Sequence, residues 1–410
     1  MFLRHSAEHD RCCPVQQPPL IALQCFNALI SIGSMLALML GTTWWTTWEW
    51  SAFEIGVVTT VANLCYGGVV TLGGRLADRW GRARSGILGA SIGMAGCLIA
   101  VITDHPAATV SAAMAGFIGA ALFFPGSAGL FSDADGAAGG PPPALHSKVR
   151  RYNLGWAAGN LAAFIGFGLL EGTARAVGYG ISIVAFLLVA LGLWKYRALP
   201  RRETVAVGDR APHAALPRLI LMYRVNLFIA CIIGMALITQ LQKGLSNRML
   251  VSDATTLASI ALACYSASYI VVFIVLGSWT GWILRPWKLW WCQVGFLFGG
   301  CGIVAVAYFG HFSPMWLGLC GALFGSAYGS SYVGSIYYSL RLPDGVGRAA
   351  AWHETFIGMG NTMGPLLAGC FMTYLVSGII GLSIFLVICA IISALVQFVL
   401  IPGAARLGAK

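Results

Sequence analysis

Twelve long apolar stretches, separated by shorter polar segments, make up most of this 410-residue chain. Each stretch is roughly 20 residues or longer, which is the length that a helix needs to cross the ~30 Å hydrocarbon core of a bilayer. None shows the alternating apolar and polar positions of an outer-membrane barrel strand. We therefore expect an all-α membrane protein with helices near residues 20–42, 53–75, 85–103, 107–131, 150–170, 176–196, 224–247, 254–279, 287–309, 314–340, 349–375 and 377–401.

A basic, proline-containing segment divides these helices into two sets of six. It predicts a cytoplasmic linker over 197–223, between six-helix bundles at 20–196 and 224–401, with cytoplasmic tails at 1–19 and 402–410. Two short repeats favour a duplication: Gly126–Ala128 recurs as Gly325–Ala327, and Gly159-Asn160 recurs as Gly360-Asn361. Both offsets are close to half the chain, as expected of transporter folds built from internal repeats.

The positions of the basic residues predict the orientation. With both termini in the cytoplasm, only Arg175, Lys243 and Arg248 of the 25 Lys and Arg would lie outside. That asymmetry is the one expected of multi-pass proteins of the cell membrane. The net charge of +11 therefore reflects topology and does not indicate a nucleic-acid partner.

Composition excludes several kinds of soluble chemistry. The chain is 58% hydrophobic and 10% charged, and its cysteines show neither a CxxC motif nor a metal-ligand spacing with histidine. No P-loop, GxSxG or HExxH motif occurs. We expect a monomeric membrane protein that is not an enzyme and has no cofactor or metal.

The stretch from Gly74 to Arg84 concentrates four arginines and one aspartate in what reads as a short loop. It resembles the cytoplasmic signature between helices 2 and 3 of the major facilitator superfamily in Gly74, Leu76, Ala77, Asp78, Arg79, Gly81, Arg82 and Arg84. Ala83 departs from the second base that the family usually has, and Trp80 stands where Phe or Tyr is commoner. The resemblance implies a secondary transporter with two rocking six-helix halves and does not identify a subfamily.

The same resemblance implies a gate. The aspartate of the family signature meets the start of helix 11 when the inner face is closed, and Asp78 would take that role. Arg79 or Arg82 would pair with Glu354 or Asp133. A basic loop that only sets topology would not need Asp78 or the two glycines. We therefore predict a gating motif of Gly74, Asp78, Arg79, Gly81, Arg82 and Asp133.

Glu354 is the one acidic residue placed well within a predicted helix. A carboxylate near hydrocarbon is costly, so such residues face partners, water or a cavity. Loss of hydration favours its protonated form, which suits a site that takes up and releases protons. The alternative is a structural latch bonded to the loop arginines, and both interpretations stay open. The neighbouring His353 is expected at the membrane boundary, near head groups.

In the family, helices 1, 4, 7 and 10 line a central cavity. With the polar positions of helices 5, 8 and 11, the candidate lining is Asn27, Ser34, Asn160, Gln240, Tyr265, Tyr269, Tyr328, Tyr332 and Asn361. Asn160 and Asn361 are expected either to bind the solute or to form bonds between helices, and the second role is slightly favoured. This lining suits a neutral, amphipathic or cationic solute better than an organic phosphate, which would need fixed positive charge.

The functional prediction is a proton-coupled transporter of a small organic solute. The direction is open between a drug or metabolite efflux antiporter and a nutrient uptake symporter. A receptor or scaffold that has kept the fold without transport is the alternative from another class.

Overall fold

The computed structural model describes residues 18–137, 145–198, 216–340 and 346–408. They form twelve α-helices and one 3-10 helix, and the described residues contain no strand, so the expected all-α fold with twelve long helices is confirmed. The helices are α1 Leu20–Thr47, α2 Ala52–Trp80, α3 Arg82–Ile102, α4 Pro106–Ala137, α5 Leu145–Leu169, α6 Arg175–Trp194, α7 Leu216–Ser246, α8 Val251–Ser278, η1 Pro286–Leu289, α9 Trp290–Phe309, α10 Pro314–Ser339, α11 Val346–Tyr374 and α12 Gly378–Gly408.

Local sequence explains where several helices begin and end. Ser51 accepts a hydrogen bond from the Glu54 backbone amide while the Glu54 carboxylate accepts one from the Ser51 amide, a capping box that starts α2. Pro314 occupies the first turn of α10, where its missing N–H costs nothing. Gly310 ends α9 in the left-handed conformation that favours glycine.

The predicted loop at Gly74–Arg84 is wrong in its conformation. Helix α2 continues to Trp80 and α3 begins at Arg82, so Gly81 alone separates them. The φ of Gly81 is 102°, in a region that residues with a Cβ rarely adopt. Helix α7 also begins at Leu216, inside the predicted linker, because residues 219–223 at the end of that linker are apolar and continue the helix. Residues 199–215 of the predicted linker lie outside the described part of the chain.

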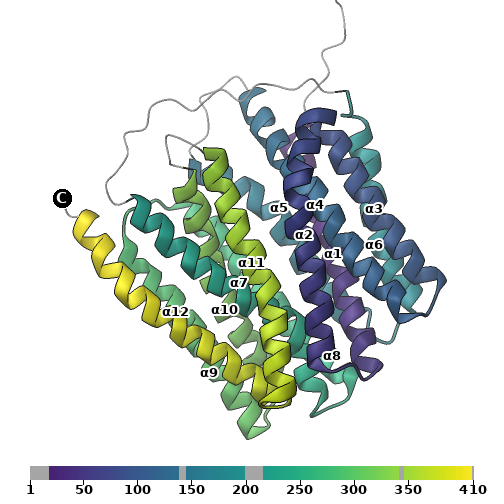
Figure 1. The fold of residues 1–410 in the computed structure, drawn as a ribbon, viewed down its shortest axis with the longest axis vertical. Coiled ribbons are helices and arrows are strands. Elements are labelled where there is room, and N and C mark those ends of the chain that lie inside the picture. Colours follow the sequence, from purple (N-terminus) through teal and green to yellow (C-terminus); the bar gives the residue numbers. More distant parts are fainter. Residues whose placement is uncertain (1–17, 138–144, 199–215, 341–345, 409–410) are drawn as a thin grey trace, which may run out of the picture.

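The helices form two bundles, α1–α6 and α7–α12, which lie side by side (Figure 1). Successive helices alternate in direction, so the start of α1 and the end of α12 lie at one end of the molecule, here called the terminal end. The opposite end is called the far end.

The packing of glycines repeats from one bundle to the other. Gly159 of α5 lies directly against Ala28 of α1, and Gly360 of α11 lies against Phe228 of α7. A Cβ at either glycine would collide with the facing backbone. The Gly-Asn repeats therefore lie at equivalent helix crossings in the two bundles. This equivalence indicates that the bundles are pseudo-symmetric.

Two asparagines repeat the same symmetry. Asn27 of α1 accepts a hydrogen bond from Ser127 of α4, and Asn226 of α7 donates one to Ser331 of α10. Each bond joins the first helix of its bundle to the fourth. Buried amides in such positions fix how neighbouring helices are aligned.

Nine of the described helices are long and apolar enough to cross a membrane, namely α1, α2, α3, α4, α6, α7, α8, α9 and α12. Leucine, isoleucine, valine and phenylalanine are exposed along α3, α6, α9 and α12, as expected of faces that meet lipid. The more polar α5, α10 and α11 fall outside that set because their sequences are less apolar. The chain is a multi-pass membrane protein.

Candidate functional site

A cavity of about 550 Å³ lies between the two bundles. Its walls come from α1, α2, α4 and α5 of the first bundle and from α10 and α11 of the second. The lining includes residues between Leu145 and Asn160 on α5, between Tyr328 and Ile336 on α10, and between Glu354 and Asn361 on α11, together with Leu340 just after α10. These segments lie in the part of each helix nearer the terminal end, and on α5 and α11 they reach just past the middle. The cavity therefore reaches from the middle of the molecule toward the terminal end.

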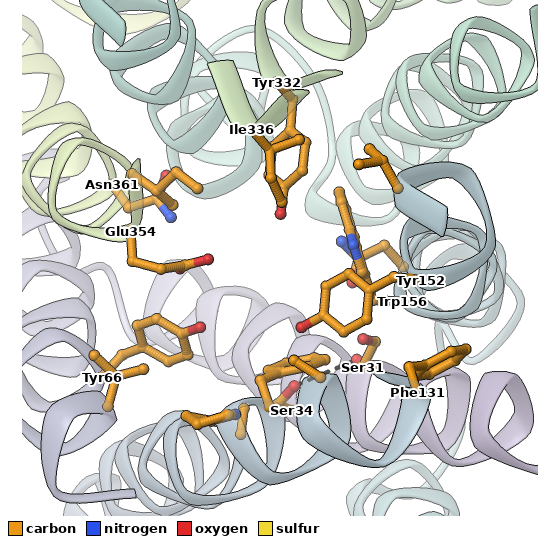
Figure 2. A pocket seen from close by; sticks show the side chains of 18 of the residues that line it. Ser31, Ser34, Tyr66, Phe131, Tyr152, Trp156, Tyr332, Ile336, Glu354 and Asn361 are labelled. Carbon is orange, nitrogen blue, oxygen red and sulfur yellow. Dashed lines mark hydrogen bonds between the residues drawn. The ribbon is translucent and has the colours of Figure 1, made fainter. Parts of the chain in front are cut away.

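Glu354 projects its carboxyl group into this cavity (Figure 2). Within the described part of the chain, it has neither a hydrogen-bond partner nor an ion-pair partner. The hydroxyls of Tyr66, Tyr152 and Tyr332 are turned toward the same space from α2, α5 and α10 (Figure 2). A carboxyl group without an ion-pair partner inside a membrane bundle is costly, so Glu354 is a candidate functional residue.

Aromatic side chains form one wall of the cavity in two layers. Trp156 of α5 packs against Tyr332 of α10 at 5.3 Å and Tyr269 of α8 at 5.6 Å between ring centroids. Tyr328 and Tyr332 line the cavity, while Tyr265 and Tyr269 are buried behind them, each 5.7 Å from Tyr328. The predicted residues Tyr265 and Tyr269 thus support the lining and do not belong to it.

The other predicted cavity residues divide in the same way. Ser34, Asn160, Tyr328, Tyr332 and Asn361 line the cavity. Asn27 is buried in its bond with Ser127. Gln240 is also buried, and its side-chain amide donates to the carbonyls of Ala52 at 3.0 Å and Pro365 at 3.4 Å. Asn27 and Gln240 do not line the cavity, and their hydrogen bonds join neighbouring helices.

Sequence reasoning missed a stripe on α5. Lys148, Tyr152, Trp156 and Asn160 follow one another at intervals of four residues and all line the cavity. Such spacing keeps side chains on one face of a helix, so Asn160 was a signal for the whole stripe. Tyr66 of α2, also missed, had no comparable signal.

The predicted head-group position of His353 is wrong. The side chain is buried between α11 and α10, and its Nδ1 lies 2.8 Å from the Ser335 hydroxyl. Its ring meets Tyr332 edge-on at 5.1 Å. His353 and Glu354 point in different directions from α11. His353 packs against α10, whereas Glu354 faces the cavity.

The signature residues lie at the terminal end, and their hydrogen bonds and ion pairs to other described residues stay within the first bundle. Arg82 forms an ion pair with Asp133 and donates to the Gly129 carbonyl at 2.7 Å, so its partners are all on α4. Asp78 and Arg79 are exposed. In the described residues, no ion pair connects them to Glu354, and Gly74 lies near Pro125 of the same bundle. The gating role of these residues stays a prediction.

Hydrogen bonds between the bundles gather toward the far end. Gln242 of α7 donates to Thr43 of α1 at 3.1 Å, and Thr373 of α11 accepts from the Phe53 amide of α2 at 3.0 Å. The bond from Gln240 of α7 to the Ala52 carbonyl of α2 adds to this seal. At the terminal end, Arg150 of α5 donates to the Ser278 hydroxyl of α8 at 2.6 Å. The structure therefore has its cavity on the terminal side and most of the described hydrogen bonds between its bundles toward the far side.

No protein-family model matches the sequence, and no curated protein matches it. Among solved structures, the chain is similar to a bacterial homologue of the human lysosomal transporter Spinster in an inward-facing, unoccupied conformation, with 17% identity, 95% of each chain covered and a TM-score of 0.62. It is also similar to the nucleoside transporter NupG, with 15% identity over 93% of this chain and 98% of that chain, and a TM-score of 0.62. At such identities the likeness shows the fold alone.

Proposed function

We propose that this chain, which has the major facilitator superfamily fold, is a secondary active transporter of a small organic solute. The observation that carries the proposal is the cavity between the two bundles, with Glu354 in its wall and no ion-pair partner for it among the described residues. In the proposed orientation the terminal end faces the cytoplasm of a cell, and the protein works as a monomer in the cell membrane. The distribution of Lys and Arg supports that orientation.

Alternating access would proceed by rocking of one bundle against the other. The far-end bonds would break and the terminal end would close, so that the cavity meets the opposite side. Asp78 and Arg79 lie at the α2–α3 junction, where closure would bring them toward the start of α11. That movement would give the signature its gating role.

Proton coupling is assigned to Glu354. In the terminal-side-open state its carboxyl group faces a cavity that water can reach, so a proton can enter or leave. Closure would bring the surrounding tyrosine hydroxyls and the solute nearer and change which protonation state is favoured. Export in exchange for protons and uptake together with protons are the two directions that this site can serve.

The lining favours a neutral or cationic amphipathic solute. Tyr66, Tyr152, Trp156 and Tyr332 present aromatic surface beside one carboxyl group, which suits an apolar body with a positive or hydrogen-bonding group. The volume lies within the roughly 300–1,000 Å³ range of small-molecule sites. Lys148 and Arg151 line the cavity nearer its mouth.

A cavity-filling substitution tests transport. In proteoliposomes we would measure uptake of tetraphenylphosphonium as a cation and of uridine as a neutral solute. Ala128 lines the cavity, so Ala128→Trp should reduce any protein-dependent flux about tenfold or more by excluding the solute. The control is Leu98→Trp on the lipid-facing surface of α3, which should leave the flux unchanged. Binding without flux by the unaltered protein would instead indicate a receptor.

A substitution in the far-end seal tests alternating access. Gln240→Leu removes the amide that donates to Ala52 on the other bundle. Because one hydrogen bond contributes about 1 kcal/mol, the population open at the far end should rise about fivefold. Spin labels on unnatural amino acids at Thr47 and Asn247 would measure this opening without interference from the 12 cysteines.

The matched control is Thr239→Val. Thr239 donates only within its own helix, to the Met235 carbonyl at 2.7 Å, so its loss should leave the distance distribution as it was. An unchanged distribution in Gln240→Leu as well would contradict a role for this bond in holding the far end closed.

A further inference from the structure

A second cavity lies apart from the central one, at the terminal end of the first bundle. Its volume is about 250 Å³, and it is lined by residues 77–84 of the α2–α3 junction, by Leu130 and Asp133 of α4, and by residues 196–198 after α6. This volume is below the roughly 300–1,000 Å³ of sites for drug-sized ligands. The cavity therefore fits a small group rather than a whole solute.

The lining favours an anion. It holds more basic than acidic side chains: Arg79, Arg82, Arg84 and Arg197 against Asp78 and Asp133. Arg82 and Asp133 neutralise each other in their ion pair, which leaves an excess of two positive charges. The first turn of α3 also reaches the cavity, and Gly81 before it offers no side-chain cap for the free backbone amides. These amides and the helix dipole add to the attraction for negative charge.

Two tryptophans place this cavity at the level of lipid head groups. Trp80, in its lining, and Trp194, at the end of α6, are each 56% exposed on the outer surface of the bundle. Exposed tryptophans of membrane proteins gather at the boundary between hydrocarbon and water. The Arg197 guanidinium lies 4.4 Å over the Trp194 ring and donates to the Trp194 carbonyl at 2.9 Å, so this arginine is held at that depth.

We propose that this cavity binds the phosphate head group of an anionic membrane lipid. Arginines between helices at this depth are suited to phosphate because their planar guanidinium groups donate two parallel hydrogen bonds. Arg84 of α3 and Arg197 after α6 would hold the phosphate from two sides, with the acyl chains passing along Trp80 and Trp194. The bound lipid would tie the end of α6 to the α2–α3 junction. This binding is independent of solute transport.

Native mass spectrometry of the purified full chain tests the site. The protein is equilibrated in detergent with equal amounts of phosphatidylglycerol and phosphatidylcholine, and the retained lipids are counted. We expect phosphatidylglycerol to be retained preferentially. Arg84→Gln and Arg197→Gln should each lower that preference about fivefold, the effect of removing one basic group near a membrane surface. Arg75→Gln is the control, since Arg75 is an exposed arginine of α2 outside the cavity.

The outcomes separate the sources of the phosphate. An unchanged lipid preference in both single variants, each shown to be folded by its elution profile, would overturn the site. Displacement of phosphatidylglycerol from the unaltered protein by millimolar inorganic phosphate would overturn the lipid as ligand and support a soluble phosphate at the same arginines. Retention of the lipid preference in Arg84→Lys with Arg197→Lys would support a site that depends on positive charge.

Discussion

Replacing Glu354 with glutamine should abolish accumulation driven by a pH gradient, reducing it about tenfold or more to the level of protein-free vesicles. Glutamine keeps the size of the side chain but cannot bind and release a proton. Exchange of labelled for unlabelled solute across the membrane, which needs no net proton movement, should persist. The measurement is uptake of the tetraphenylphosphonium or uridine probe in proteoliposomes, with and without a pH gradient, and with counterflow as the second reading.

The control for charge removal is Glu49→Gln. Glu49 is exposed beyond the far end of α1, so its neutralisation should leave pH-driven accumulation intact. If Glu354→Gln also accumulates solute normally under a pH gradient, then Glu354 does not couple protons. The latch role would remain, and it would appear as a change in the balance between the two open states.

The twelve helices were predictable because the bilayer imposes one requirement on each of them. A segment that crosses hydrocarbon must be long and apolar, and such runs are visible in the sequence. The ends were less predictable. Helix α7 begins at Leu216, because the apolar residues 219–223 belong to the helix and not to the linker. Helix α4 continues to Ala137, because a helix can extend beyond the hydrocarbon into polar sequence where hydropathy carries no signal. The junction at Gly81 was missed for the same reason.

The site was predictable only where chemistry is rare. An acid inside an apolar run has few possible explanations, and Glu354 does line the cavity. Tyrosine is less informative than an acid, because its apolar ring can pack in a core and its hydroxyl can also face a polar cavity. Tyr265 and Tyr269 on α8 have the same four-residue spacing as Tyr328 and Tyr332 on α10. Which pair faces the cavity depends on how α8 and α10 pack, and the tyrosine spacing carries no information about that packing.

Asparagine and glutamine were ambiguous for a related reason. Asn160 and Asn361 line the cavity, whereas Asn27 and Gln240 are buried in bonds between helices. An amide satisfies either environment, and the choice depends on the neighbour that the fold brings to it. The fold supplies Ser127 to Asn27 and the Ala52 carbonyl to Gln240.

Replacing Asp133 with asparagine should lower the free energy of unfolding by about 2–3 kcal/mol. This loss is smaller than that for a deeply buried ion pair, because water reaches Arg82. The side chains of Arg82 and Asp133 are 15% and 8% exposed, so the substitution leaves a largely buried guanidinium without its countercharge. Arg82 would keep only its bond to the Gly129 carbonyl. The expected loss is measured as the shift in the unfolding transition of the purified protein in detergent.

The chain contains a matched ion pair at the other end of the first bundle. Asp104 pairs with Arg175, but the Asp104 side chain is 99% exposed, so Asp104→Asn should cost at most about 1 kcal/mol. Arg82→Gln together with Asp133→Asn should recover part of the loss, because the uncompensated charge is then absent. Equal destabilisation by Asp133→Asn and Asp104→Asn would show that the Arg82–Asp133 pair contributes no more than a surface contact. In that case the α2–α3 junction would owe its position to Gly81 and to packing against α4.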